Sequence, residues 1–216
     1  MSDEGTTEDK DYLVPEDFRK FMVKETGTAY DVSGEKFTFE EVANWDLGSV
    51  RYELYDGVLI KMEAPSIRHQ ELCDELSYLF KNYLKGKKCK SFSAVNVRLN
   101  HETSDDTYFI PDLVIVCDQS KIDKRSINGA PDLVIEVLSP TTRRYDVIEK
   151  RHKYEQAGVK EYWLVNQEDG VVEVALLSED GLYRSRTYSN NENIKVRILE
   201  DLVINFADIL EDLWSD

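Results

Sequence analysis

The sequence has few cysteines and histidines, the residues that bind structural metal ions, and it lacks the long apolar runs of a membrane-spanning protein. Its three cysteines, Cys73, Cys89 and Cys117, are widely spaced and form no CxxC pair, so we expect reduced thiols that pack in the interior rather than bind metal. The three histidines are too scattered to make a zinc site. No apolar run approaches the roughly 18 residues that span a bilayer, and the amino terminus shows no secretory signal. We therefore expect a cytoplasmic protein with no membrane segment.

Positive charge is also scarce, because the 216 residues carry 27 Lys and Arg against 43 Asp and Glu, a net charge of -16. Residues 1–17 hold seven acidic side chains and one lysine, which predicts a disordered acidic tail ahead of a single domain at residues 18–216. Non-specific affinity for nucleic acid comes mainly from lysines and arginines that neutralise phosphates. The composition therefore argues against binding of nucleic acid by bulk charge, although it allows a local basic groove.

The most informative segment is PDLVIEVLSP, at residues 131–140. The apolar run at residues 133–138 predicts a strand buried on both faces. Glu136 lies within it, and a buried carboxylate needs a cation, a hydrogen-bond network or a metal. A second apolar strand, PDLVIV at residues 111–116, opens on Asp112, so pairing of the two strands would bring the two acids together. The alternative is that Glu136 forms a structural salt bridge and Asp112 is a turn residue at the strand entry.

Other patterns predict the elements around these two strands. Thr38 and Glu41 form a capping box for a short helix at residues 38–45, and Asp56-Gly57 predicts a hairpin within residues 51–61. An apolar stripe predicts a long helix that opens at Ser66. We expect further strands at residues 92–99, 107–117, 161–166, 170–177 and 182–188, and helices over residues 142–157 and from residue 206.

A run of lysines follows the apolar stripe of the long helix. These lysines either complement the negative end of the helix dipole or form a wall for a phosphate backbone. The run comprises Lys81, Lys85, Lys87, Lys88 and Lys90.

The two acids suggest a chemistry. Hard divalent cations such as Mg²⁺ take several oxygen ligands, and two carboxylates with a backbone carbonyl supply about half an octahedron. Such a cation lowers the pKa of its water and polarises a phosphoryl oxygen, which allows phosphodiester cleavage at neutral pH. A lysine near the attacking water would complete the site.

These segments closely resemble the Uma2 family, also called DUF820, whose members are restriction-endonuclease-like proteins of the PD-(D/E)XK nuclease superfamily. The resemblance extends from about residue 38 to residue 210. It implies an α/β (α+β) restriction-endonuclease-like core, with a central mixed β-sheet flanked by helices and additional β-hairpins. It also implies an endonuclease that hydrolyses DNA phosphodiester bonds with Mg²⁺ or Mn²⁺. The matching motifs are RYELYDG, APSIRHQ, PDLVIV, EVLSP, EK at residues 149–150 and GVKEYW at residues 158–163.

By resemblance, Asp112 and Glu136 are the metal ligands of the superfamily, and the carbonyl of Val137 is a third. The superfamily lysine, two residues beyond the glutamate, is here Leu138. Strand alternation points side chains 136 and 138 to the same face, so a lysine at 138 would have reached the metal water and leucine cannot. The resemblance suggests that Lys150, on the following helix, takes over the role.

Two further residues complete the predicted site. Glu53 and His69 match positions typical of the family and are expected to line the cleft. The alternatives are that Lys150 faces solvent and that His69 is a surface residue in a first helical turn.

Two functions therefore remain open from the sequence. The first is a Mg²⁺-dependent DNA endonuclease; the second is a catalytically inactive nuclease-like module for protein interaction, favoured by the acidic charge and by Leu138. We expect a homodimer, since two chains related by a two-fold axis match the symmetry of a DNA duplex. The hairpin at Asp56-Gly57 and the strands after Trp163 are the expected contact surfaces.

Overall fold

The structure is a computed structural model that describes residues 36–45 and 50–214, with side chains described as far as residue 210. The expected acidic tail at residues 1–17 lies outside the described residues. The helical elements are α1 (Phe39–Val42), α2 (Ile67–Leu84), the 3-10 turn η2 (Gln119–Lys121), the π-helix η3 (Tyr145–Lys150), α3 (Arg151–Ala157) and α4 (Phe206–Trp214). None of the described helices is long and apolar enough to cross a membrane.

The described strands form three sheets. The larger sheet contains β3 (Lys90–Phe92), β6 (Leu113–Val116), β8 (Leu133–Val137), β9 (Glu161–Asn166), β10 (Val171–Leu177) and β11 (Tyr183–Ser189). A second sheet contains β1 (Tyr52–Tyr55), β2 (Val58–Lys61), β4 (Asn96–Arg98), β5 (Tyr108–Phe109) and β7 (Ser126–Asn128). The third is the pair β12 (Asn193–Lys195) and β13 (Val203–Asn205).

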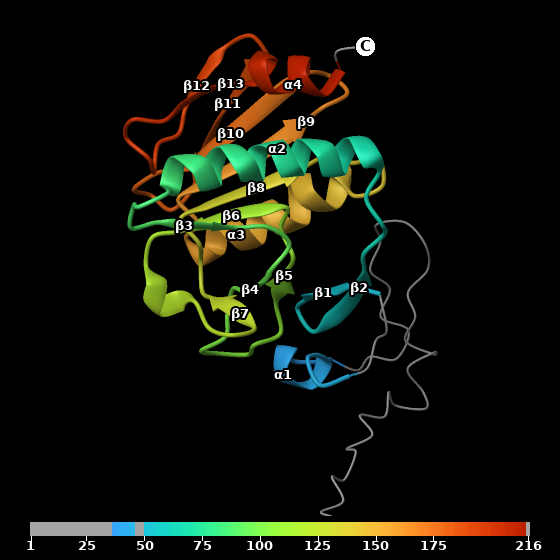
Figure 1. Ribbon diagram of the computed structural model, residues 1–216. Helices are drawn as coiled ribbons and strands as arrows, with labels where there is room; N and C mark the ends of the chain where they lie inside the picture. Colours follow the sequence, from blue (N-terminus) through green and yellow to red (C-terminus); the bar gives the residue numbers. More distant parts are fainter. Residues whose placement is uncertain (1–35, 46–49, 215–216) are drawn as a thin grey trace, which may run out of the picture.

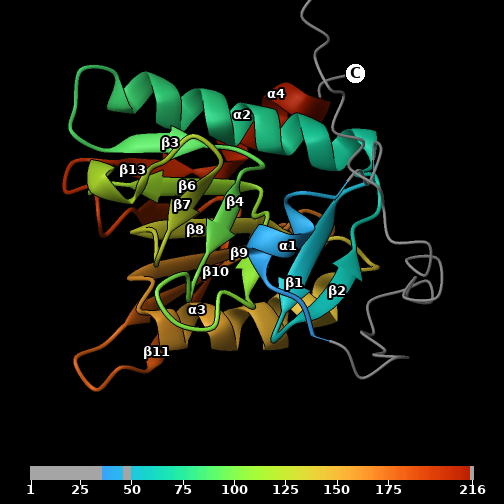
Figure 2. The ribbon, with the colours of Figure 1, turned by 90° about the horizontal axis from the view of Figure 1, so that it is seen from below.

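The six-stranded sheet is the centre of the fold, in the order β11-β10-β9-β8-β6-β3. β6 and β8 pair antiparallel and β8 and β9 pair parallel, so the two predicted central strands are neighbours in a mixed sheet. α2 covers one face of this sheet and α3 lies on the other (Figures 1 and 2). Alternate residues of β8 serve the two faces: Ile135 packs with Phe80 of α2, and Val134 packs with Tyr154 of α3.

The five-stranded sheet, in the order β2-β1-β5-β4-β7, packs on the side of the large sheet that carries α3. Val97 and Phe109, from its middle strands, share one core with Val134 of β8. Its β1–β2 hairpin turns at Asp56 and Gly57, both at positive φ, as the Asp-Gly signal predicted. Figure 2 shows this sheet and α1 seen from below.

Two expected strands are each divided between the two sheets. Within residues 92–99, Phe92 ends β3 and Asn96–Arg98 form β4. Within residues 107–117, Tyr108–Phe109 form β5 and Leu113–Val116 form β6. The first break is at Ala94, which has φ of 53°, and the second is at Pro111, which has no N–H to donate. Ala94 N–H donates to the Pro111 carbonyl at 3.1 Å, so the two breaks stabilise each other.

The expected helices are present. The capping box at Thr38 and Glu41 is formed, Ser66 caps α2 through the His69 N–H, and Gly158 ends α3 at φ of 87°. The helix expected over residues 142–157 differs at its start, because residues 145–150 form a π-helix rather than an α-helix. The short strands β7, β12 and β13 were not predicted, since three residues are too few to show a period.

The prediction of three reduced thiols is wrong for two of them, because Cys89 and Cys117 form a disulfide. Lys90 pairs with Val116 across β3 and β6, and continuing this register by one residue places the two cysteines opposite each other. Their separation of 28 residues concealed this pairing in the sequence. Cys73 is free and buried, as expected.

Reduction of the Cys89–Cys117 disulfide should lower the thermal midpoint of unfolding. A cross-link over 28 residues restricts the unfolded chain, an effect on the order of 3 kcal/mol by the chain-entropy argument. Thermal unfolding with and without dithiothreitol measures it, and a Cys89→Ser variant, already without the cross-link, should not respond. Under denaturing, non-reducing conditions one thiol per chain should react; three reactive thiols would contradict the pairing.

Candidate active site

A cleft of about 650 Å³ opens at the N-terminal end of α2. It is bounded by the β1–β2 hairpin, the segment that leads into β6, the C-terminal end of β8 and η3. The structure brings together in this cleft every residue that the sequence proposed for the site. These residues are Glu53, His69, Asp112, Glu136, Val137 and Lys150.

The carboxylates of Asp112 and Glu136 each face a backbone N–H of the segment that carries the other acid. Leu113 pairs with Ile135, and continuing this register places Asp112 opposite Glu136. The Val137 N–H donates to Asp112 Oδ2 at 2.7 Å, and the Asp112 N–H points at Glu136 Oε2 at 3.4 Å. The two carboxylates thus lie at the end of the β6–β8 ladder, where the strands separate and open into the cleft.

Lys150 is buried among carboxylates and does not face solvent. Its Nζ lies 2.9 Å from Glu53 Oε1, 3.1 Å from Glu136 Oε1 and 3.3 Å from Asp146 Oδ1. The exposed fraction of Lys150 is 4%, and the three acids are equally enclosed. The ammonium therefore lies beside Glu136, the position that a lysine at residue 138 would have reached.

The sequence analysis missed Asp146 and Tyr154. Asp146 precedes Lys150 by four residues and shares its ion cluster, and the Tyr154 hydroxyl donates to Glu136 Oε1 at 3.0 Å. The spacing of Asp146 and Lys150 was the available signal, because residues four apart on a helix face the same way. The hydroxyl of Tyr145, also in the cleft, is buried with no hydrogen-bond partner in the part of the chain that the structure describes.

Burial controls the protonation of this cluster. Desolvation raises the pKa of Glu53, Glu136 and Asp146 above their ordinary values, although the nearby lysine opposes the shift. For Lys150, burial lowers the pKa, but the three carboxylates more than offset it and the pKa is raised well above that of an ordinary lysine. The three carboxylates therefore favour the ammonium form of Lys150.

The surplus of carboxyl groups suits a cation. Glu53, Glu136 and Asp146 share one ammonium, and Asp112 adds a fourth carboxyl group at the same place. Asp112, Glu136 and the Val137 carbonyl offer oxygen donors of the type that Mg²⁺ prefers. The donor set of the cleft therefore fits a hard divalent cation.

His69 is a second group that organises this corner. Its Nε2 lies 2.8 Å from the Val137 carbonyl oxygen and 3.4 Å from Asp112 Oδ2. Burial lowers the pKa of His69, but Asp112 and the carbonyl more than offset it, so the pKa is raised. The ring is buried in the cleft wall rather than exposed on the first turn of α2.

Asp132 shows that the Pro-Asp dipeptide alone does not define the site. The sequence contains this dipeptide twice, before β6 and before β8. Asp132 accepts the Cys117 N–H at 2.7 Å and pairs with Lys160 at 2.6 Å, outside the cleft. Leu138, at the position of the superfamily lysine, is an apolar residue of the same hydrophobic core as Tyr154.

Comparison with known proteins places this arrangement in a family. Residues 38–207 match the model of the Uma2 family, whose description is "Putative restriction endonuclease". The chain belongs to the Uma2 family. It is also 26% identical over 175 residues to an uncharacterized protein of Synechocystis sp. (strain PCC 6803), covering 80% of this chain and 89% of that protein.

A solved structure shows the same fold. This Uma2 chain matches, at a TM-score of 0.69 and 16% identity, the crystal structure of "a putative nuclease belonging to DUF820" from Anabaena variabilis. The match covers 81% of this chain and 98% of the other. The predicted mixed α/β, restriction-endonuclease-like architecture is therefore confirmed.

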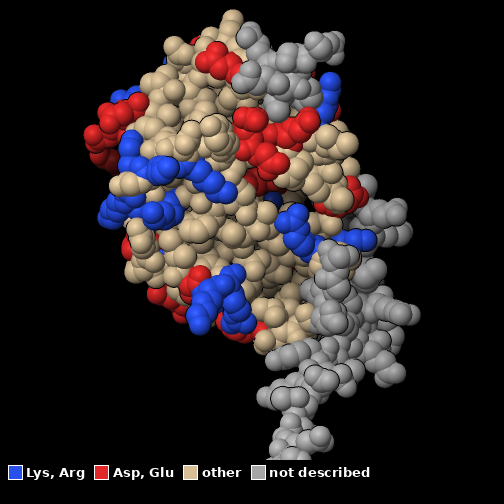
Figure 3. All heavy atoms as spheres, in the orientation of Figure 1, with Lys and Arg blue, Asp and Glu red and all other residues tan. Residues whose placement is uncertain are grey.

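The lysine run of this Uma2 protein lies far from the cleft. In Figure 3, Lys and Arg side chains gather over the C-terminal end of α2 and over β3, while acidic side chains cover the earlier part of α2. Lys85 follows His69 by 16 residues, which is about 24 Å along a helix. The run therefore lies at the negative end of the helix dipole and outside the cleft, whose lining includes the cations Arg51, Lys61 and Arg68.

Replacing Lys150 by methionine should destabilise the protein by roughly 3–5 kcal/mol at pH 8, because three buried carboxylates lose their shared cation. Carboxyls whose pKa is raised in the folded state take up protons on folding. The stability loss of the variant should therefore become smaller as the pH falls toward about 4, the ordinary pKa of these carboxyls in the unfolded chain. Urea unfolding at pH 8 and at pH 5.5 measures both effects.

Lys160→Met is the matched control for this substitution. Lys160 is 66% exposed and pairs with Asp132, so its loss should cost under about 1 kcal/mol at either pH. Equal stability losses for the two variants at pH 8 would contradict the ion cluster.

Proposed function

We propose that this Uma2 protein is a metal-dependent endonuclease of the PD-(D/E)XK type that hydrolyses DNA phosphodiester bonds. Asp112, Glu136 and the Val137 carbonyl would hold Mg²⁺ or Mn²⁺. The observation that carries the proposal is the contact of 3.1 Å between Lys150 Nζ and Glu136 Oε1. Lys150, at the end of η3, thus places beside Glu136 the cation that the sequence lacks at Leu138.

The metal would lower the pKa of a water molecule and polarise the scissile phosphate. The chain supplies the remaining functions. Lys150, held protonated by Glu53 and Asp146, offsets negative charge that develops on the phosphoryl oxygens in the transition state. Because its partners fix the ammonium before substrate binds, little reorganisation is needed during the reaction.

The groups at the cleft mouth would bind the nucleic acid. Arg51, Lys61 and Arg68 line this mouth and can contact phosphates on either side of the scissile bond. His69 donates its Nε2–H to the Val137 carbonyl and so orients one proposed metal ligand. A local basic rim of this kind is compatible with the acidic charge of the whole chain.

A plasmid cleavage assay tests the proposal. With Mg²⁺ or Mn²⁺ the protein should nick or linearise plasmid DNA, and Asp112→Asn and Glu136→Gln should reduce the rate by at least about 100-fold, since each removes a ligand charge while keeping the side-chain shape. Asp132→Asn is the matched control, because it changes the other Pro-Asp aspartate outside the cleft. The wild type should lose activity with chelator and regain it with added metal.

The outcome also decides between the two functions left open by the sequence. A pure, folded wild type that leaves plasmid intact with both metals would favour the inactive interaction module. Activity that survives Glu136→Gln would overturn the assignment of the site.

We also propose that the protein is a homodimer, so that two clefts can act on the two strands of a duplex. The β1–β2 hairpin and the strands after Trp163 remain the proposed contacts; among the described strands, β11 forms one edge of the large sheet. Light scattering at tens of micromolar protein should give twice the chain mass of 25.1 kDa. A monomer mass would argue against the dimer without affecting the site.

A further inference from the structure

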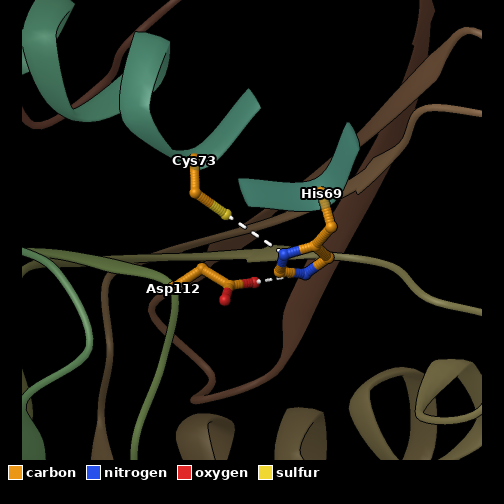
Figure 4. Close-up of side chains that lie close together, drawn as sticks. All are labelled: His69, Cys73 and Asp112. Carbon is orange, nitrogen blue, oxygen red and sulfur yellow. Dashed lines mark hydrogen bonds and ion pairs between the residues drawn. The ribbon is translucent and has the colours of Figure 1, made fainter. Parts of the chain in front are cut away.

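A second group of side chains of metal-ligand type lies at the same end of α2. His69 and Cys73 are four residues apart on the helix, so both side chains leave it on one face. Asp112 reaches toward them from the segment before β6, and Figure 4 shows the three side chains converging. Their ligand atoms all lie within 4.8 Å of one another.

We propose that His69, Cys73 and Asp112 form a binding site for a borderline-soft divalent cation of the zinc class. A thiolate and an imidazole suit such a cation, whereas Mg²⁺ takes oxygen ligands almost exclusively. The site goes beyond the proposed endonuclease function, which uses oxygen donors.

The separation of the nitrogen and the sulfur matches a tetrahedral site. His69 Nδ1 lies 3.5 Å from Cys73 Sγ. Metal bonds of about 2.0 Å to nitrogen and 2.3 Å to sulfur at tetrahedral angles place these two ligands about 3.5 Å apart. The i and i+4 positions of α2 therefore already hold the nitrogen and the sulfur at the spacing that zinc requires.

The hydrogen bonds of His69 leave the correct nitrogen for the metal. A carbonyl oxygen can only accept, so the contact of 2.8 Å from Nε2 to the Val137 carbonyl requires Nε2 to carry the proton. The Nδ1 atom, which faces Cys73, then has its lone pair available. Metal-binding histidines usually donate their other ring N–H to a carbonyl or carboxylate, which fixes the ring and strengthens the ligand.

The site is open on one side. Cys73 is buried in the core beneath α2, whereas His69 and Asp112 also line the cleft. An ion can therefore enter from the cleft and keep water as its fourth ligand, as in open zinc sites. Binding replaces the thiol proton by the metal ion, and the proton passes to solvent.

Asp112 belongs to both proposed sites. One carboxylate cannot be a full ligand of two cations at once, a hard cation beside Glu136 and a zinc-class cation beside Cys73. The zinc-class cation would therefore compete with Mg²⁺, and this consequence rests on the proposed endonuclease function. The occupancy of the thiol site itself does not depend on that function.

Cobalt(II) is a suitable probe because bonding to a thiolate gives a near-ultraviolet charge-transfer band. Titration of the wild type with Co²⁺ should produce this band with one ion per chain, and Zn²⁺ should abolish it. Cys73→Ser should lose the band, and His69→Gln should weaken Co²⁺ binding by at least about tenfold. Circular dichroism verifies that both variants are folded.

Matched controls identify the source of the band. The Cys89→Ser/Cys117→Ser double variant should keep it, because its remaining thiol is Cys73, and His152→Gln, which changes an exposed histidine of α3, should also keep it. A band that persists in Cys73→Ser, or a wild type without a band at a molar excess of Co²⁺, would overturn the proposal.

A second measurement needs no variant. X-ray absorption at the zinc edge of the zinc-loaded wild type should show one sulfur in the coordination shell, and a shell of nitrogen and oxygen alone would overturn the site. Neither measurement uses DNA cleavage. A protein that cuts DNA without the band overturns this inference alone, and one that gives the band without cutting overturns the endonuclease proposal alone.

Discussion

The buried ammonium of Lys150 connects the main parts of the molecule. Its three carboxylate partners come from the small sheet, from the large sheet and from η3. Burying one charge is costly, and burying four is tolerated only when the geometry satisfies all of them. The cluster therefore links the two sheets and the π-helix, which also share one hydrophobic core. The same placement aligns the groups of the cleft, so stability and the proposed chemistry rest on one set of contacts.

Hydrogen bonds at the ends of the central strands fix the positions of Asp112 and Glu136. Beyond the β6–β8 ladder, backbone N–H groups lack a partner strand, and the carboxylates of Asp112 and Glu136 accept from them instead. Each acid is thus fixed by the chain segment that carries the other. This mutual arrangement explains how two acids on separate strands keep one geometry while the cleft remains open on one side.

Charge is distributed unevenly over the chain. The whole sequence is strongly acidic, yet the cleft mouth carries Arg51, Lys61 and Arg68, and the lysine run lies at the other end of α2. A protein of this kind gains little from long-range attraction to a polyanion. Binding of nucleic acid would depend on local contacts at the rim and on the cation in the cleft.

The sequence by itself determined the central strands, the hairpin at Asp56-Gly57, α2 and the end of α3, and it singled out six of the residues that line the cleft. These features are local: period, caps and turn residues act over a few positions, and the resemblance to the Uma2 family supplied the site. The tertiary structure decided what depends on long-range pairing. It showed that Cys89 meets Cys117, that two apparent strands divide between two sheets, and that Asp146 and Tyr154 join Lys150. It also placed Cys73 beside His69 and Asp112. Most of these contacts join segments far apart in the chain, which no local pattern records. The pairs Asp146–Lys150 and His69–Cys73 are only four residues apart, but their burial at the cleft depends on the packing of other elements.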